Sequence, residues 1–288
     1  MAKKNNWLVY ALITMVTWGI WGAFSSTPDY PSTLTYVVWA ISMIPCALVA
    51  LANIKFKLDT HPKAVILSMG VGLLGAGGQL VLFEALKHGP AYLIFPLISV
   101  APIVTVILST IFLKERVSKL GALGIVLAFV ALICFSLSSK SDEATQDNLW
   151  ILLASLVFIC WGTQAFVMKL ANNHTPDAES VFVYMAASAV LLIPVALLMT
   201  DFSQPINHSF NGPYLTFCIQ ILNAIGAFAL VYANRYGKAM IVAPLADACA
   251  PVITTALSLV LYAHVPGIAQ ILGIVSAITC VLIFSREQ

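Results

Sequence analysis

The sequence GKAMIVAPLADACAPVITTALS, residues Gly237–Ser258, repeats with changes an earlier sequence, GPAYLIFPLISVAPIVTVILS, residues Gly89–Ser109. Both copies open on Gly-x-Ala and then carry Pro-Leu, Ala-Pro, Thr and Ser at matched spacing. Each copy lies in an apolar run long enough to cross a bilayer, so each predicts a membrane helix. One residue differs in kind, because Asp247 in the second copy stands where the first copy has Ile98 or Ser99.

Four prolines inside these two predicted helices are candidate hinges: Pro96, Pro102, Pro244 and Pro251. A proline in a helix removes one hydrogen bond and leaves the carbonyl four residues earlier without its partner. Pro251 does this to the carbonyl of Asp247, so a carboxylate and a free backbone acceptor are expected at one point of the same helix. Inside a membrane both groups must face protein or a water-filled cavity. This point is therefore the first candidate for the working site.

Composition predicts an integral membrane protein. Of the 288 residues, 60% are hydrophobic and 9% are charged, whereas soluble domains have about 25% charged residues. A net charge of +2, with no basic tract beyond Lys3 and Lys4, argues against a nucleic-acid partner. The six cysteines lie in apolar runs without the close spacing of a metal site, so we expect packing roles for them and neither a metal nor a cofactor.

Apolar runs of about 20 residues predict ten membrane helices. These are Trp7–Phe24, Thr33–Ala52, Ala64–Leu86, Ala91–Leu113, Val117–Leu137, Leu149–Leu170, Ser180–Thr200, Pro213–Asn234, Ala239–Ala263 and Ile268–Phe284. In the resulting topology, all but Lys87 and Lys140 of the 14 lysines and arginines fall on one side. Because short cytoplasmic loops are the positively charged ones, we expect a protein of the inner (plasma) membrane with both termini in the cytoplasm.

Further matched residues extend the repeat over the whole chain. At offsets of 143 to 149 residues, they are Trp18-Gly19 with Trp161-Gly162, Pro45 with Pro194, and Gly124-Ile125-Val126 with Gly273-Ile274-Val275. We therefore expect a first five-helix repeat over residues 1–138, a periplasmic linker over 139–148 and a second repeat over 149–288. Because five is odd, the repeats enter the membrane from opposite sides, as in many secondary transporters.

These residues resemble those of a known family. The chain is similar to EamA-type members of the drug/metabolite transporter superfamily in three features. Each half has Trp-Gly in its first helix, each half has the Pro-Leu…Ala-Pro helix, and Gly121 and Gly124 follow Phe112-Leu113-Lys114-Glu115-Arg116. The resemblance covers nearly the whole chain. It implies a transporter that exports an amino acid or another small metabolite, although some relatives import sugars.

The sequence departs from the family pattern at one helix end. The family's Leu-x-Glu after the fourth helix is present as Leu113-Lys114-Glu115, but the second half has Tyr262-Ala263-His264-Val265-Pro266. The role of the glutamate is therefore absent or altered in the second half.

Asp247 is the leading candidate for contact with substrate or a coupling ion. It lies about 12 Å from the cytoplasmic edge at 1.5 Å per residue, close to the middle of the bilayer. An acid at this depth is a functional hypothesis by default, with a structural hydrogen bond between helices as the alternative. It would either carry a proton between the two open states or act as the counter-charge of a cationic substrate.

Glu84 is a second candidate, for a gate or a substrate contact. Lys87 and His88 follow it on the same helix face, so a local ion pair is the alternative interpretation.

Uncharged candidates lie near the middle of their helices, where they would bind a polar or aromatic substrate or else hold neighbouring helices together. They are Gln79, Gln164, Gln220 and Asn223, with the tryptophans Trp18, Trp21 and Trp161. Five glycines, Gly70, Gly72, Gly75, Gly77 and Gly78, predict a small-residue face for close helix contact or for bending. The G-x-G-x-x-G spacing within them is not a dinucleotide site, because no strand precedes it.

The leading hypothesis is a secondary transporter that moves a small polar metabolite by alternating access, with the proton as candidate coupling ion. An uptake carrier for sugars or other small solutes is the alternative within this fold. An intramembrane enzyme would need paired acids, or a nucleophile with a base, at one depth, and the sequence offers only Asp247. A receptor or scaffold would need neither a mid-membrane carboxylate nor four prolines.

Overall fold

All regular secondary structure in the described part of the chain is helical. The computed structural model describes residues 7–88, 94, 97, 98, 100–136, 149–262, 267–284 and 286. The helices are α1 (Trp7–Phe24), α2 (Ser32–Asn53), α3 (Pro62–His88), α5 (Pro102–Phe112), α6 (Lys119–Ser136), α7 (Leu149–His174), α8 (Ala178–Leu191), α9 (Ile193–Leu198), the π-helix η1 (Phe210–Tyr214), α10 (Leu215–Tyr236), α11 (Ala239–Tyr262) and α12 (Ile268–Phe284).

Ten apolar segments in the described residues match the ten predicted membrane helices. Six have the length and composition needed to cross a membrane, and α5, α6, α11 and α12 supply shorter apolar stretches. Large aliphatic side chains lie on the outside of the bundle, among them Ile66 at 71% exposed and Leu152 at 67%. Such an apolar outer surface fits contact with lipid. The prediction of an all-α membrane protein is confirmed.

Prolines divide some of these segments and not others. The predicted helix Ser180–Thr200 is split at Leu192 into α8 and α9, and Pro194 lies in the first turn of α9, where its missing N–H is tolerated. In contrast, α11 continues through Pro244 and Pro251 as one helix. The described helix α5 begins at Pro102. Pro96 and the predicted linker 139–148 lie outside the described residues.

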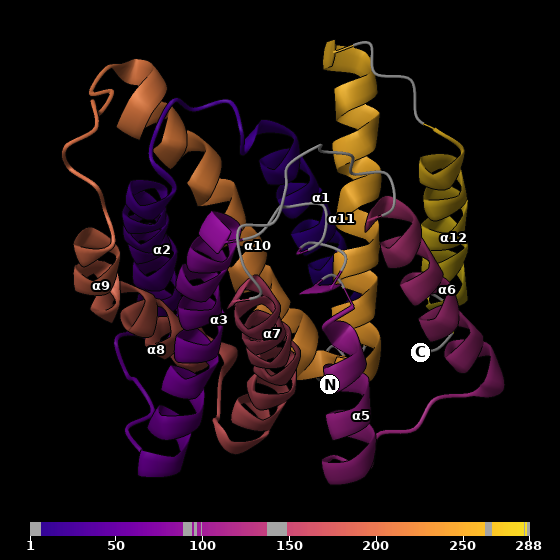
Figure 1. Ribbon diagram of the computed structural model, residues 1–288. Coiled ribbons are helices and arrows are strands. Elements are labelled where there is room, and N and C mark those ends of the chain that lie inside the picture. The colour runs from indigo at the N-terminus through magenta and orange to yellow at the C-terminus, as the bar shows by residue number, and fades with distance from the viewer. Residues whose placement is uncertain are drawn as a thin grey trace.

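The helix contacts between the two halves recur between the matched helices (Figure 1). Helix α1 packs on α10 and α11, and its counterpart α7 packs on α3 and α5. Helix α2 packs on α10, and its counterpart α8 packs on α3. The pairs α6 with α12 and α2 with α8 each join two counterparts. This pattern is that of two five-helix repeats with inverted topology, as predicted.

Matched glycines bring two pairs of helices into close contact, α1 with α11 and α7 with α5. We call these two contacts the seams. A Cβ atom added at Gly19 in α1 would lie 2.5 Å from the Cβ of Ile253 in α11. A Cβ added at Gly162 in α7 would lie 2.4 Å from the carbonyl oxygen of Ala101, directly before α5. Membrane helices approach each other closely where side chains are small. The glycines of the two matched Trp-Gly pairs therefore make equivalent close helix contacts in the two halves.

Matched threonines bridge the same two seams. The hydroxyl of Thr254 in α11 donates to the carbonyl of Gly19 at 2.9 Å, and the hydroxyl of Thr105 in α5 donates to the carbonyl of Gly162 at 2.6 Å. These bonds satisfy hydroxyl groups that would otherwise be costly in an apolar interior.

The predicted small-residue face of α3 is confirmed at three of its glycines. A Cβ at Gly72 would lie 2.4 Å from a backbone oxygen of α8, and Cβ atoms at Gly75 and Gly78 would lie 2.2 and 2.6 Å from side chains of α7. The prediction of close contact is wrong for Gly77, where a Cβ would meet nothing within 4 Å among the described residues, and a Cβ at Gly70 would make only an ordinary contact, 3.9 Å from Val167. Gly72, Gly75 and Gly78 thus let α3 pack closely against α8 and α7 of the second half.

One end of the bundle carries the described lysines and arginines other than Lys87, and we call it the basic end. It includes Arg116 in the α5–α6 turn, Lys169 near the end of α7, and Arg235 and Lys238 where α10 meets α11. Helix α1 begins and α12 ends on this side, in the lower half of Figure 1. That the basic end faces the cytoplasm stays a prediction from the sequence.

Candidate functional site

Two matched tryptophans lie where the halves meet. The indole N–H of Trp18 in α1 donates to the carbonyl oxygen of Asn223 in α10 at 3.2 Å, and that of Trp161 in α7 donates to the carbonyl oxygen of Gly75 in α3 at 3.2 Å. Asn223 and Gly75 are themselves matched positions of the repeat. Both N–H groups are therefore engaged by the backbone of the opposite half.

Each of these rings also packs against a glycine one turn further along the same partner helix. A Cβ at Gly226 would lie 2.4 Å from Cδ1 of Trp18, and a Cβ at Gly78 would lie 2.6 Å from Nε1 of Trp161. Any larger residue would displace the indole from its carbonyl partner. This geometry favours the packing interpretation of Trp18 and Trp161 over an open aromatic cavity.

Two of the predicted amides serve as partners for further indoles. The N–H of Trp21 donates to Oε1 of Gln220 at 3.0 Å, and the N–H of Trp39 donates to Oδ1 of Asn223 at 2.8 Å. These bonds tie α1 and α2 to α10. The amide oxygens of Gln220 and Asn223 are thus occupied.

The other two predicted amides are open. Gln164 takes the position in α7 that matches Trp21 in α1, and its amide lies against Gly75 of α3, where a Cβ would be 2.2 Å from Nε2. Gln79 lies about one turn further along α3. Both are half-buried, and neither amide has a hydrogen-bond partner among the described residues. Because an unpaired buried amide is costly, these groups are suited to bind a polar solute or water.

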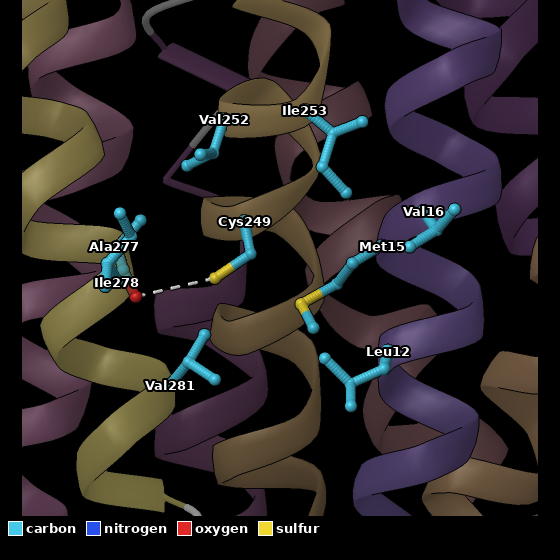
Figure 2. A pocket seen from close by; sticks show the side chains of 9 residues that line it. All are labelled: Leu12, Met15, Val16, Cys249, Val252, Ile253, Ala277, Ile278 and Val281. Atoms are coloured by element: carbon cyan, nitrogen blue, oxygen red, sulfur yellow. Dashed lines mark hydrogen bonds between the residues drawn. The ribbon is translucent and has the colours of Figure 1, made fainter. Parts of the chain in front are cut away.

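Asp247 lies on the side of α11 that faces the bundle interior. Cys249 points the opposite way, toward α12, where its Sγ is 3.7 Å from the carbonyl oxygen of Ala277 (Figure 2). Two residues turn a helix by about 200°, so Asp247 is directed away from α12. Thr254, about two turns later on nearly the same side, binds the backbone of α1.

The carboxylate of Asp247 has no partner in the described part of the chain. No hydrogen bond or ion pair reaches it, and the residue is half-buried. In the described helices every other charged side chain lies within five residues of a helix end, whereas Asp247 lies eight residues from the start of α11. Ile98, one of the two residues at the matched position of the first half, is 4% exposed in an apolar cluster. The matched positions of the two halves therefore differ in their surroundings as well as in residue type.

Glu84 lies at the other end of the bundle from the basic end and forms the expected local ion pairs. Its carboxylate is 3.0 Å from the Lys87 ammonium and 3.5 Å from the ring of His88. The Glu84 side chain is 38% exposed. These contacts favour a local structural role for Glu84, and its role as a gate stays a prediction.

An apolar groove between α1, α11 and α12 is not suited to a polar solute. It has a volume of about 170 Å³ and is lined by aliphatic side chains, Met15 and the thiol of Cys249 (Figure 2). Val16 and Ile278 on its rim are 45% and 50% exposed on the outside of the bundle. The groove thus faces the lipid and is separate from the side of α11 that carries Asp247.

The charged contacts at the start of α11 were not predicted. Both carboxylate oxygens of Glu115 accept backbone N–H bonds from Ala239 and Met240, each at 3.1 Å. The ammonium of Lys169 donates to the carbonyl of Gly237 at 2.6 Å. In the sequence, the signal for Lys169 is a cation inside the last turns of an apolar helix, where it needs carbonyl acceptors. The partner of Glu115 could not be identified, because 124 residues separate it from Ala239.

Known proteins similar to this chain include several that are named as transporters. The EamA-like transporter family matches twice, over residues 5–137 and 148–286. A pseudopaline exporter, CntI, of Pseudomonas aeruginosa is 26% identical over 246 residues, which cover 82% of this chain and 81% of the exporter. An uncharacterized transporter of Archaeoglobus fulgidus is 32% identical over 152 residues, 48% of this chain and 50% of the relative.

Two further similarities concern the architecture. An uncharacterized protein of Methanocaldococcus jannaschii, MJ1333.1, is 31% identical over 134 residues, which are 97% of its length but 46% of this chain, so it is about as long as one repeat. One crystal structure with 17% sequence identity superposes with a TM-score of 0.78 over 98% of this chain and 96% of that one, which shows a shared fold. With both halves matched by one family model, the chain belongs to the EamA-like transporter family.

Proposed function

We propose that this transporter carries a small polar solute, an amino acid or a similar metabolite, out of the cell through the space between its two halves. The observation that carries the proposal is the unpartnered carboxylate of Asp247, which faces the interior of the bundle. Alternating access exposes this carboxylate to one side of the membrane and then to the other. The relative named as a pseudopaline exporter supports the outward direction.

The isolation of Asp247 supports coupling to a positive charge. A charged carboxylate in the middle of a membrane helix costs about 2.5–3.5 kcal/mol on insertion scales, and more where no partner compensates it. Asp247 is therefore proposed to bind a proton in one stage of the cycle and to release it in another. If the solute is cationic, the solute itself is the counter-charge and no proton is needed.

The open amides support a polar rather than an apolar solute. Gln79 and Gln164 each offer an N–H₂ donor and a carbonyl acceptor to the interior of the α3–α7 pair. Amides of this kind bind neutral groups such as hydroxyls as readily as zwitterions. A carrier for a sugar or another neutral solute is therefore the second candidate, favoured by these amides and independent of Asp247.

The proposed setting is the plasma membrane with the basic end in the cytoplasm. The support is the distribution of positive charge, which favours the cytoplasm for short loops. A C-terminal fusion to a reporter that is active only in the cytoplasm tests this orientation. We expect the cytoplasmic reporter to be active in the full-length fusion. If only a reporter that requires the periplasm is active, the proposed orientation is contradicted.

Flux measurements on the purified protein in liposomes test the proposed function. Thermal unfolding with amino acids, polyamines, sugars and nucleosides selects the solute first, because a ligand at 100 times its Kd stabilises the native state by about 2.7 kcal/mol. We expect saturable flux of the solute that stabilises the protein. Folded, inserted protein that shows no saturable flux for any member of these classes would contradict the proposal.

A further inference from the structure

The turn between α10 and α11 is held by charged side chains from two other parts of the fold. The ammonium of Lys169, in α7, donates to the carbonyl oxygens of Asn234 at 2.8 Å, Arg235 at 3.3 Å and Gly237 at 2.6 Å. Glu115, in the α5–α6 turn, accepts from the first two backbone N–H groups of α11, each at 3.1 Å. The free carbonyls at the end of one helix and the free N–H groups at the start of the next are thus both bound.

The charges of Glu115 and Lys169 are placed favourably at the two helix ends, whereas the nearby Arg235 repels Lys169. A cation lies at the carbonyl end of α10 and an anion at the N–H end of α11, as the dipoles of the two helices prefer. Lys169 and Glu115 also attract each other across the turn. In addition, the Lys238 ammonium donates to the backbone carbonyl of Arg116. The α5–α6 turn, α7 and the start of α11 are therefore joined into one layer across the basic end.

The backbone around Glu115 adopts a conformation that brings its carboxylate back toward α11. Lys114, directly before it, has a φ of 54°, a left-handed conformation that is unfavourable for a residue other than glycine. The N–H of Glu115 then returns to the carbonyl of Ser109 at 3.2 Å. Strained backbone of this kind persists where surrounding contacts require it.

The matched positions in the sequence cannot repeat these contacts at the other end of the bundle. The residue that matches Glu115 is His264, and the one that matches Lys169 is Ser26. Neither residue can supply the same charge that its counterpart supplies at the basic end. The pair of charges supplied by Glu115 and Lys169 is therefore specific to one end in the sequence, whereas the described helices pack as the repeat predicts.

We propose that Glu115 and Lys169 are a lock that holds the basic end closed, and that α11 leaves Glu115 when this end opens. The proposal rests on the alternating-access function proposed above. Asp247 follows the start of α11 by about 12 Å at 1.5 Å per residue, so movement of this turn changes access to the carboxylate. Loss of the lock shifts the population toward the state open at the basic end.

The test measures access to the interior without any solute. Ala243, one turn before Asp247 on nearly the same side of α11, is replaced by cysteine in a chain whose six native cysteines are alanine. A membrane-impermeant thiol reagent is applied from the basic end in sealed vesicles. Glu115→Gln and Lys169→Met each remove one charge of the lock. Asp59→Asn is the matched control, since it removes a charge at the same end, where the Asp59 carboxylate accepts one hydrogen bond from the described residues, from the N–H of His61 in the α2–α3 loop.

We expect the labelling rate to rise about tenfold in Glu115→Gln and in Lys169→Met, the effect of about 1.4 kcal/mol on a two-state equilibrium. Asp59→Asn should label at the rate of the parent. Unchanged labelling in both lock variants, with thermal unfolding showing that they are folded, would overturn the lock. Fast labelling in a protein that moves no solute would instead support the lock and contradict the proposed function.

Discussion

Replacing Gly162 by alanine tests whether the two halves are joined by the tight seams described above. The new Cβ would lie 2.4 Å from the carbonyl oxygen of Ala101 and 2.6 Å from the Cβ of Val104, whereas ordinary contacts begin at 3.4 Å. Neither atom can rotate away, because one belongs to the backbone and the other is fixed to it. Helices α5 and α7 must therefore separate by about 1 Å, at the overpacking cost of about 1–3 kcal/mol.

Gly77→Ala is the matched control for this change. It adds the same methyl group to a glycine of α3, but there the new Cβ meets nothing within 4 Å among the described residues. Both variants gain up to about 1 kcal/mol from the better helix propensity of alanine. The difference between them is therefore the packing cost, which we place at about 2–3 kcal/mol because the obstacle is backbone.

Thermal unfolding in detergent measures this difference. At roughly 2–4 °C per kcal/mol, Gly162→Ala should unfold about 4–12 °C below Gly77→Ala. Gly19→Ala, at the matched position, should behave like Gly162→Ala. A Gly162→Ala protein as stable as Gly77→Ala would refute the tight seam between α5 and α7.

Three further changes have defined outcomes. Pro244→Ala with Pro251→Ala should leave the protein inserted and slow its transport, because α11 loses the two positions where its backbone lacks hydrogen bonds; unchanged flux would remove these prolines from the mechanism. Glu84→Gln should cost less than about 1 kcal/mol of stability in thermal unfolding and should keep flux, because its pair with Lys87 is exposed; a loss of flux without loss of stability would make it a gate. Gln164→Leu should weaken solute binding about tenfold or more at unchanged stability, as an open amide in contact with solute requires; binding at the parent affinity would show that the solute does not reach α7.

The sequence was sufficient to predict the helices and their symmetry. Lipid-facing helices must be about 20 apolar residues long, so hydropathy alone located ten of them. The match of Trp18-Gly19 with Trp161-Gly162 showed the repeat, because the seam that each Gly makes admits no larger residue. The break at Leu192 was not predicted, since the apolar run continues through it and only the position of Pro194 marks it.

The site was predictable only in part. Asp247 stood out because an acid in an apolar run is rare, and its orientation then follows from helix geometry. The partners of polar groups could not be predicted, since they depend on which helices meet. Gln220 and Asn223 bind indoles while Gln79 and Gln164 remain open, although the four look alike in sequence. For the same reason Lys169 could be interpreted only as a cation near the end of a predicted helix, and its contact with the turn after α10 could not be predicted.

The role of Asp247 is tested most directly by its replacement with asparagine, with Asp201→Asn as the matched control. Asp201 is an acid in an exposed loop that binds Ser203 and Gln204. Each protein is reconstituted in liposomes, and solute exchange without a gradient is compared with accumulation under an imposed proton gradient. The proton-coupled account predicts that Asp247→Asn exchanges solute but does not accumulate it, whereas a cationic solute would no longer bind at all; Asp201→Asn should do both. Full gradient-driven accumulation by Asp247→Asn would contradict the account in either form.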